Sequence, residues 1–380
     1  MDELMSSEAA PLRRSAISLR GLVRPLAGPA VAVLIAIVVG ALLVAAVGQN
    51  PLDVYVTLIK GGLVGWPNLS VALQLTTPLI FTGLAVAISF RAGLWNIGAE
   101  GQMLMGALAA GIVGYAVSLP VYLHIPLCVI AAFLGGAAWA GIPALLRVYL
   151  GVNELVVCLM MNPIALLLTG YVSARALKAP GPTNKLPDIL ETAILPNFSL
   201  FSQLNAGIFI ALACCAIVAF VNSATLRGFE WKMIGLNPRF AYYGGIDVRK
   251  SALTIFLLSG GIAGLAGAEQ VLGVYKAYYD NFSPGYGFDG IAVAMLAKNN
   301  PIGVILAAFL FGALNGGSAV LQMMTGVSKY LVQVLQFIIV LVLAAQFSFR
   351  WRRATTGLRS SAAPKGGSQG LGKPPLSESE

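Results

Sequence analysis

Charged residues are scarce in this sequence, and their scarcity excludes most classes of soluble protein. Only 10% of the 380 residues are Asp, Glu, Lys or Arg, whereas 58% are hydrophobic. A soluble domain usually carries about 25% charged residues. Here the charges are confined to short blocks, and the apolar runs between them approach the ~20 residues that a helix needs to cross a bilayer. Because these runs do not alternate with polar residues, they also exclude a transmembrane β-barrel. The sequence predicts an all-α polytopic membrane protein.

Histidine and cysteine are rare too, which leaves little material for a metal or redox site. The chain has one histidine, His124, and four cysteines that all lie inside apolar runs without metal-binding or redox spacing. Residues 367–373 have the glycine spacing of a P-loop, but Pro374 stands where Ser or Thr would ligate magnesium. We therefore expect no metal, no cofactor and no nucleotide site in this chain.

The apolar runs predict about ten transmembrane helices, some broken or re-entrant. The run that starts near residue 29 is too long for a signal peptide, so we expect an uncleaved first span. The region 69–118 is broken in its middle, and the eighth run is short enough to form only a half-helix. The predicted spans are 29–47, 69–90, 98–118, 122–146, 153–174, 205–222, 251–273, 287–298, 301–323 and 329–348.

The positive charges predict the orientation of these spans. If residues 1–28 are cytoplasmic, 18 of the 24 Lys and Arg fall in segments on the cytoplasmic side. This bias follows the positive-inside rule and places both termini in the cytoplasm. Residues 29–348 then form one transmembrane domain with a basic cytoplasmic loop at 223–250. Residues 349–380 have the composition of a disordered basic cytoplasmic tail.

The loop 223–250 contains signals for a short helix outside the membrane. Asn237 is a suitable N-cap, and Pro238 fits the first helical position. Gly244 or Gly245 can adopt the left-handed conformation that ends a helix. Such a helix can dock into a groove on a cytoplasmic partner. An ordinary interfacial helix is equally consistent with this spacing.

Two further segments interrupt the apolar runs with glycine and polar residues. In residues 90–102 the polar side chains should face the bundle interior or a cavity, although a cytoplasmic turn anchored by Arg91 is the alternative. Residues 283–290 form a glycine-rich approach to a short helix, as in discontinuous transporter helices. An outer loop followed by a tight helical hairpin fits this second segment equally well.

Four motifs from these segments occur in order along the chain and resemble those of a known family. They are Gly93-Leu-Trp-Asn-Ile-Gly-Ala-Glu-Gly-Gln102, Asn153-Glu-Leu-Val-Val-Cys-Leu-Met-Met-Asn162, Ile234-Gly-Leu-Asn-Pro238 and Gly285-Tyr-Gly-Phe-Asp-Gly-Ile-Ala-Val-Ala294 with Asn299-Asn-Pro301. Over about residues 30–348 the chain resembles the permeases of the branched-chain amino acid and simple-sugar group of bacterial ABC importers. Within that group it is most similar to the nucleoside (guanosine-type) uptake branch.

The resemblance implies a permease subunit in the bacterial inner membrane that forms the pathway for a nucleoside. It implies three partners: a cytoplasmic ABC ATPase, a second homologous permease and an extracytoplasmic substrate-binding lipoprotein. The loop helix would then couple ATP hydrolysis to transport, and no nucleic acid is involved. We assign ATPase coupling to Gly235, Asn237, Pro238, Phe240, Ala241, Tyr242 and Gly245, and the substrate pathway to Asn96, Glu100, Gln102, Asn162, Asp289 and Asn300.

Three alternatives remain at this point. The same permease role for a simple sugar is compatible with the same motifs. An ion-coupled secondary carrier would need buried ionisable residues, for which Glu100 and Glu269 are candidates. An intramembrane enzyme would need paired carboxylates, a Ser/Lys or Ser/His pair, or metal ligands within the spans. The few embedded acids argue against that class, and we expect the chain not to be an enzyme.

Overall fold

The computed structural model describes residues 34–35, 37–46, 48–325, 328, 330–334, 336–338 and 341 of the chain. Helices dominate this part, which has only two isolated β-bridges, so the predicted all-α class is confirmed. The elements are α2 (Pro51–Leu63), α3 (Trp66–Arg91), α4 (Ala99–Ala116), α5 (Val121–Leu150), α6 (Glu154–Tyr171), η1 (Val172–Ala176), η2 (Glu191–Ala193), α7 (Gly207–Ala224), α8 (Leu226–Leu236), α9 (Pro238–Tyr243), α10 (Val248–Glu269), η3 (Gln270–Tyr275), α11 (Tyr286–Leu296) and α12 (Pro301–Thr325).

Six helices in the described part are long and apolar enough to cross a membrane. They are α3, α5, α6 with η1, α7, α10 with η3, and α12, and each matches a predicted span. The predicted span 98–118 appears as α4, and the predicted half-helix 287–298 appears as the short apolar helix α11. The predicted spans 29–47 and 329–348 lie partly outside the described residues. The predicted terminal segments 1–28 and 349–380 lie entirely outside them. The total of about ten spans therefore stays a prediction.

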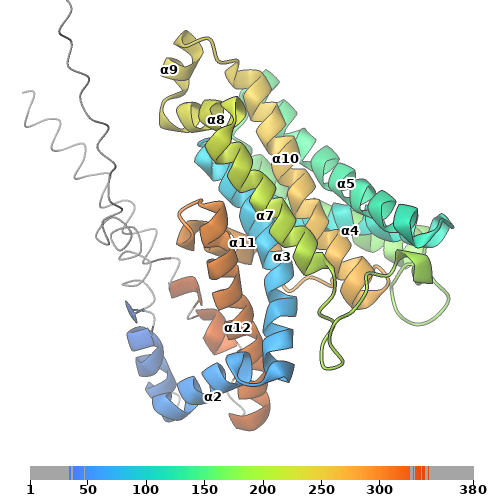
Figure 1. Ribbon diagram of the computed structural model, residues 1–380, viewed down its shortest axis with the longest axis vertical. Coiled ribbons are helices and arrows are strands. Elements are labelled where there is room, and N and C mark those ends of the chain that lie inside the picture. Colours follow the sequence, from blue (N-terminus) through green and yellow to red (C-terminus); the bar gives the residue numbers. More distant parts are fainter. Residues whose placement is uncertain are drawn as a thin grey trace, which may run out of the picture.

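The helices α3 and α10 are the most deeply buried of the six candidate spans, and they pack against each other (Figure 1). Small residues bring the backbones together. A Cβ atom added to Gly264 would overlap the carbonyl of Ala132 in α5, and one added to Gly312 would overlap Thr76 in α3. Gly264 in α10 and Gly312 in α12 therefore lie at helix contacts, where the absence of a side chain permits close approach.

Two non-helical stretches enter the bundle from opposite ends. Residues 92–98 follow α3 and lead to α4, whereas residues 276–285 follow η3 and lead to α11. The first residues of α4 and α11 meet inside the bundle, since a Cβ atom on Gly287 would overlap the backbone of Glu100. A Cβ atom on Gly290 would likewise contact Thr82, which lies well inside α3. These two helices therefore begin inside the bundle rather than at its ends.

Two helices were not expected from the sequence. The helix α8 fills the first part of the predicted loop 223–250, because Thr225 caps its N-terminus and Trp231 and Ile234 bury one side against the bundle. The helix α2 begins with Asn50 as N-cap and Pro51 at the first position, signals that we overlooked between two apolar runs. Figure 1 places α8 and α9 at one end of the bundle and α2 at the other.

Candidate functional site

The helix α9 forms from the signals that the sequence predicts. The Asn237 side chain accepts hydrogen bonds from the backbone N–H groups of Arg239 (3.0 Å) and Phe240 (3.1 Å). Pro238 is the first helical residue, and Gly245 ends the turn with φ of 82°. The Ile246 amide donates to the carbonyl of Ala241 at 3.0 Å, which closes the end of the helix. The expected short helix of under two turns is confirmed.

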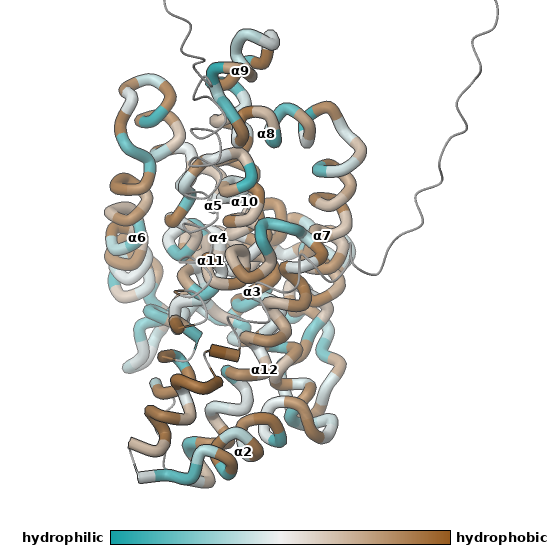
Figure 2. The backbone as a smooth tube through the Cα atoms, turned by 90° about the vertical axis from the view of Figure 1, so that its left-hand side faces the viewer, coloured by the Kyte–Doolittle hydropathy of each residue, from teal (hydrophilic) through white to brown (hydrophobic). Residues whose placement is uncertain are grey.

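The outer face of α9 is an aromatic surface. Phe240, Tyr242 and Tyr243 are exposed by 62%, 68% and 86%, while Ala241 is only 1% exposed and faces the bundle. The rings of Tyr242 and Tyr243 meet edge to face with centroids 5.9 Å apart. In Figures 1 and 2, α9 projects beyond the end of the bundle. Exposed aromatic residues grouped on one short helix are typical of a protein-binding surface.

The segment that carries α9 is joined to the core at the end of α3. A Cβ atom on Gly235, at the end of α8, would overlap the Arg91 carbonyl, and the Cα of Gly235 lies 3.4 Å from the position of a Cβ on Gly93. The guanidinium of Arg91 donates to the Asn222 carbonyl at 3.3 Å. Gly235 therefore forms the contact between α8 and the non-helical stretch 92–98. A side chain at position 235 would overlap the backbone at the end of α3.

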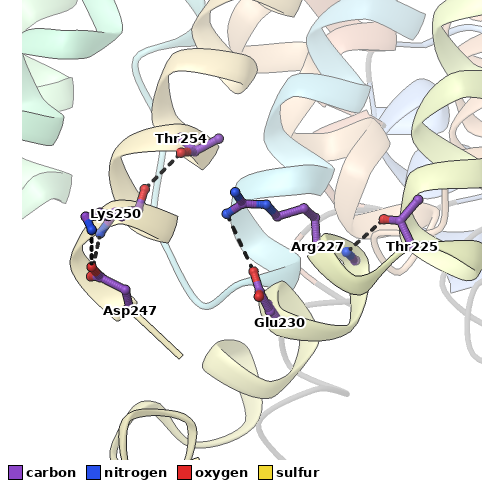
Figure 3. Close-up of polar contacts among 7 residues, drawn as sticks. Thr225, Arg227, Glu230, Asp247, Lys250 and Thr254 are labelled. Carbon is purple, nitrogen blue, oxygen red and sulfur yellow. Dashed lines mark hydrogen bonds and ion pairs between the residues drawn. The ribbon is translucent and has the colours of Figure 1, made fainter. Parts of the chain in front are cut away.

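The helices on either side of α9 are held by local polar contacts (Figure 3). In α8, Arg227 forms an ion pair with Glu230 at 3.6 Å. At the start of α10, the Asp247 carboxylate accepts a hydrogen bond from the Lys250 backbone amide at 3.0 Å. This hydrogen bond lowers the pKa of Asp247 from its ordinary value, because it stabilises the ionised carboxylate. Both helices thus enter the α9 segment with ordered ends.

A cavity of about 640 Å³ opens beside the start of α10. Its walls come from the first non-helical stretch, the α5–α6 turn and the first turn of α10, and they include Trp95 and Arg249. Arg147 and Glu154 form an ion pair in the same wall, and Glu154 also accepts a hydrogen bond from the Trp95 backbone amide at 3.4 Å. With two arginines and one glutamate, the cavity wall is net positive.

Three of the predicted pathway residues lie together in one buried network. Asn96 donates through Nδ2 to the Ser259 hydroxyl at 2.7 Å and to Gln102 Oε1 at 3.0 Å, and its Oδ1 accepts from Gln102 Nε2 at 2.8 Å. The Asn162 side chain accepts from the Gly101 amide and donates to the Ile97 carbonyl, both at 3.0 Å. These amides bond almost entirely to the protein itself, and Asn96 is fully buried.

The other predicted pathway residues lie apart from this network. Glu100 accepts a hydrogen bond from the Gly287 amide at 2.6 Å, which joins the starts of α4 and α11. Asp289 follows in the first turn of α11 and is only half-buried. Asn300 is exposed and caps α12 by accepting from the Ile302 amide at 3.0 Å. The structure thus separates a buried network, a helix junction, a half-buried acid and a helix cap.

Several polar residues beside the predicted set were missed. Ser259 joins Asn96 to α3 by donating to the Ala85 carbonyl at 2.6 Å. Asn281 is exposed, has a positive φ of 54° and lies in the stretch that leads to α11, where Ser283 is half-buried. Glu269, which was predicted only as a candidate under the ion-coupled alternative, is buried and bonded to the amide side chains of Asn205 (2.9 Å) and Gln270 (2.6 Å). The local sequence offers no signal for these partners, which are mostly distant along the chain.

Comparisons with known proteins give the family. Residues 68–344 match the family described as branched-chain amino acid transport system, permease component. The chain is 37% identical over 327 residues to the guanosine ABC transporter permease protein NupP of Bacillus subtilis, which covers 85% of this chain and 94% of that protein. It is 35% identical over 338 residues to the glucose ABC transporter permease protein TsgB13 of Haloferax volcanii, covering 85% and 88%. It is 32% identical over 336 residues to the nucleoside ABC transporter permease protein NupB of Lactococcus lactis, covering 84% and 90%. The chain therefore belongs to the permease component family of branched-chain amino acid transport systems.

Proposed function

We propose that this protein is the permease subunit of an ATP-binding-cassette importer and forms the membrane pathway for a nucleoside. The observation that carries the proposal is the 37% identity to a guanosine permease over 94% of that protein's length. The nucleoside permease NupB adds support. A simple sugar is the second candidate, because the glucose permease TsgB13 is nearly as similar, at 35% identity.

The complete importer contains partners in addition to this chain. A separate cytoplasmic ABC ATPase hydrolyses ATP, a second homologous permease completes the pathway, and an extracytoplasmic substrate-binding lipoprotein delivers the solute. The chain crosses the bacterial inner membrane about ten times, with both termini and the coupling loop 223–250 in the cytoplasm. The distribution of Lys and Arg supports this orientation.

The coupling contact is α9. Its aromatic face is exposed, its ends are capped, and its base is packed on the end of α3. A motion that the ATPase imposes on α9 passes through Gly235 to Arg91 and Gly93, and so to the non-helical stretch that holds Asn96. The cavity beside the start of α10 has a net positive wall, which favours contact with acidic side chains of the partner.

The solute pathway runs along the first turn of α11 and the stretch before it. Asn281 is exposed and Asp289 is half-buried, so both side chains can be reached from outside this chain. A polar group at membrane depth that faces lipid is costly, so it should face an aqueous route or a partner subunit. The buried network of Asn96, Gln102 and Asn162 supports this wall from behind.

Uptake by the complete importer tests the proposed function. The permeases and ATPase are reconstituted in proteoliposomes with ATP on the ATPase side and the loaded binding protein on the other. We expect guanosine uptake that needs ATP hydrolysis and persists when an ionophore removes ion gradients. Uptake of glucose with no uptake of any nucleoside would favour the sugar alternative, and uptake abolished by the ionophore despite ATP would contradict the importer.

The role of α9 has its own test. Replacing Phe240 and Tyr243 together by alanine should uncouple the importer, so that ATPase activity no longer depends on substrate and uptake falls. Tyr149→Ala is the matched control, because Tyr149 is an aromatic residue near the end of α5 that is exposed by 70%. Unchanged uptake in the double variant, with assembly intact, would remove α9 from the coupling contact.

A further inference from the structure

The helix α2 has an arrangement of side chains that neither a span nor a loop requires. It contains 13 residues, so its length is about 20 Å, well short of the ~30 Å hydrocarbon core. It meets the apolar helix Ile37–Ala46 at a bend of 119°. Figure 1 shows it lying across the end of the bundle opposite α9, beside the last part of α12. It is therefore too short to cross the membrane by itself.

One face of α2 is packed against protein. Gly61 and Gly62 contact α12 so closely that added Cβ atoms would meet Val320 and overlap the Ala313 carbonyl. Val54 and Leu58 are buried in a small hydrophobic cluster that also contains Val44, Leu321 and Val332. The Tyr55 hydroxyl donates to the Ile37 carbonyl at 2.7 Å. Because this face is held against α12, the orientation of the exposed faces of α2 is fixed as well.

The two remaining faces differ in chemistry. Leu52, Val56, Ile59 and Leu63 recur at the spacing of one helical stripe and are exposed by 73%, 47%, 57% and 42%. Asp53 and Lys60 are also exposed, but lie seven residues apart on a neighbouring stripe. The helix therefore presents a protein face, an apolar face and a charged face side by side. In Figure 2, α2 accordingly shows both hydrophobic and hydrophilic segments.

We propose that α2 is an interfacial helix whose apolar stripe inserts into the lipid surface at the end of the bundle opposite α9. A helix parallel to a bilayer at the rim of a membrane protein meets protein, acyl chains and water on three different sides, and α2 has one face for each. Trp66, exposed by 50%, begins α3 at the same level, where indole side chains favour the membrane–water boundary. The packed face then anchors the end of α12 to this boundary.

A lipid surface fits the apolar stripe better than a second protein chain does. Asp53 and Lys60 border the stripe directly, and at an interfacial depth they remain hydrated while the apolar side chains reach the acyl region. This inference does not depend on the transported solute or on the ATPase, because it concerns only the position of α2. Its test can therefore fail while the proposed function stands, and the reverse is also possible.

Fluorescence of labels placed around α2 tests the inference on the assembled importer. Single cysteines replace Val56, Ile59, Asp53 or Lys60 in a background without the four native cysteines that retains uptake, and each carries an environment-sensitive fluorophore. In liposomes with doxyl-labelled phosphatidylcholine, we expect the labels at Val56 and Ile59 to emit at shorter wavelength and to be quenched more by shallow than by deep doxyl groups. The labels at Asp53 and Lys60 should be quenched by aqueous iodide.

Two results would overturn the inference. If the label at Ile59 is quenched by iodide as strongly as the label at Lys60, the stripe faces water. If the labels at Val56 and Ile59 are quenched by neither doxyl lipid nor iodide, another protein chain covers the stripe. Because all four positions are exposed, none of the substitutions removes a packed side chain, and uptake by each variant provides a check that it is folded.

Discussion

The two non-helical stretches that enter the bundle from opposite ends use their polar side chains in opposite ways. In residues 92–98, the Asn96 side chain is fully buried and bonds to Gln102 and Ser259. In residues 276–285, Asn281 is exposed, whereas the Ser283 hydroxyl accepts hydrogen bonds from the amides of Gly285 (3.1 Å) and Tyr286 (3.4 Å). Polar residues within a span therefore do not by themselves indicate a solute route. A polar side chain that stays exposed, as Asn281 does, is the more informative sign.

The largest effect is expected from breaking the inward-facing network. In Asn96→Leu, Gln102 loses both of its hydrogen bonds to Asn96 while it remains buried, and Ser259 keeps only its bond to the Ala85 carbonyl. Each buried group left unsatisfied costs about 1–3 kcal/mol. We expect little folded protein and almost no uptake, measured by size-exclusion chromatography in detergent and by transport. A variant that assembles normally and loses only uptake would instead make Asn96 a solute ligand, and the contrast between the two stretches would fail.

A smaller and more selective effect is expected at Asp289. Asp289→Asn keeps the size of the side chain but removes its charge from the face of α11 that we assign to the pathway. We expect uptake to fall about tenfold, or about 1.4 kcal/mol, with an unchanged melting temperature. Asp53→Asn on α2 is the matched control and should leave uptake unaltered. If Asp289→Asn loses as much thermal stability as Asn96→Leu, Asp289 supports the fold, as Asn96 does, and does not contact the solute.

The next effect in size concerns Asn281, whose backbone is left-handed. Asn281→Gly suits the φ of 54° and removes only the side chain. We expect uptake to fall while thermal stability stays the same or rises. Uptake assays over a range of solute concentrations should locate the loss in KM. If uptake is unchanged, the outward-facing polar groups of this stretch do not touch the solute.

The smallest effect is expected at Asn300, which the sequence places in the pathway. Its side chain caps α12 by accepting from the Ile302 amide, so Asn300→Ala should lower stability by about 1 kcal/mol. Ser and Asp can also cap a helix, so Asn300→Ser and Asn300→Asp should keep the stability that Asn300→Ala loses, as thermal melts would show. Uptake should change little in all three variants. A strong loss of uptake in Asn300→Asp, with normal melting, would return this residue to the pathway.

The sequence was sufficient to predict elements whose signals are local. The helix α9 follows from Asn237, Pro238 and the glycines after it, and α11 follows from a short apolar run after a glycine-rich stretch. The helix α2 was missed because 13 amphipathic residues fall below the length that marks a span. The partners of Asn96 could not be predicted, since Ser259 is 163 residues away and only the packing of α3 against α10 brings it close.

The non-helical stretch 276–285 limits how this end of the bundle can open. Its backbone is satisfied by a second strand-like segment: the Leu186 amide donates to the Tyr278 carbonyl at 2.9 Å, the Ile189 amide to Lys276 at 3.0 Å, and the Asp280 amide to Asn184 at 3.0 Å. Separating these two segments would break all three backbone hydrogen bonds. In any opening motion at this end of the bundle, we therefore expect residues 276–280 and residues 184–189 to move together.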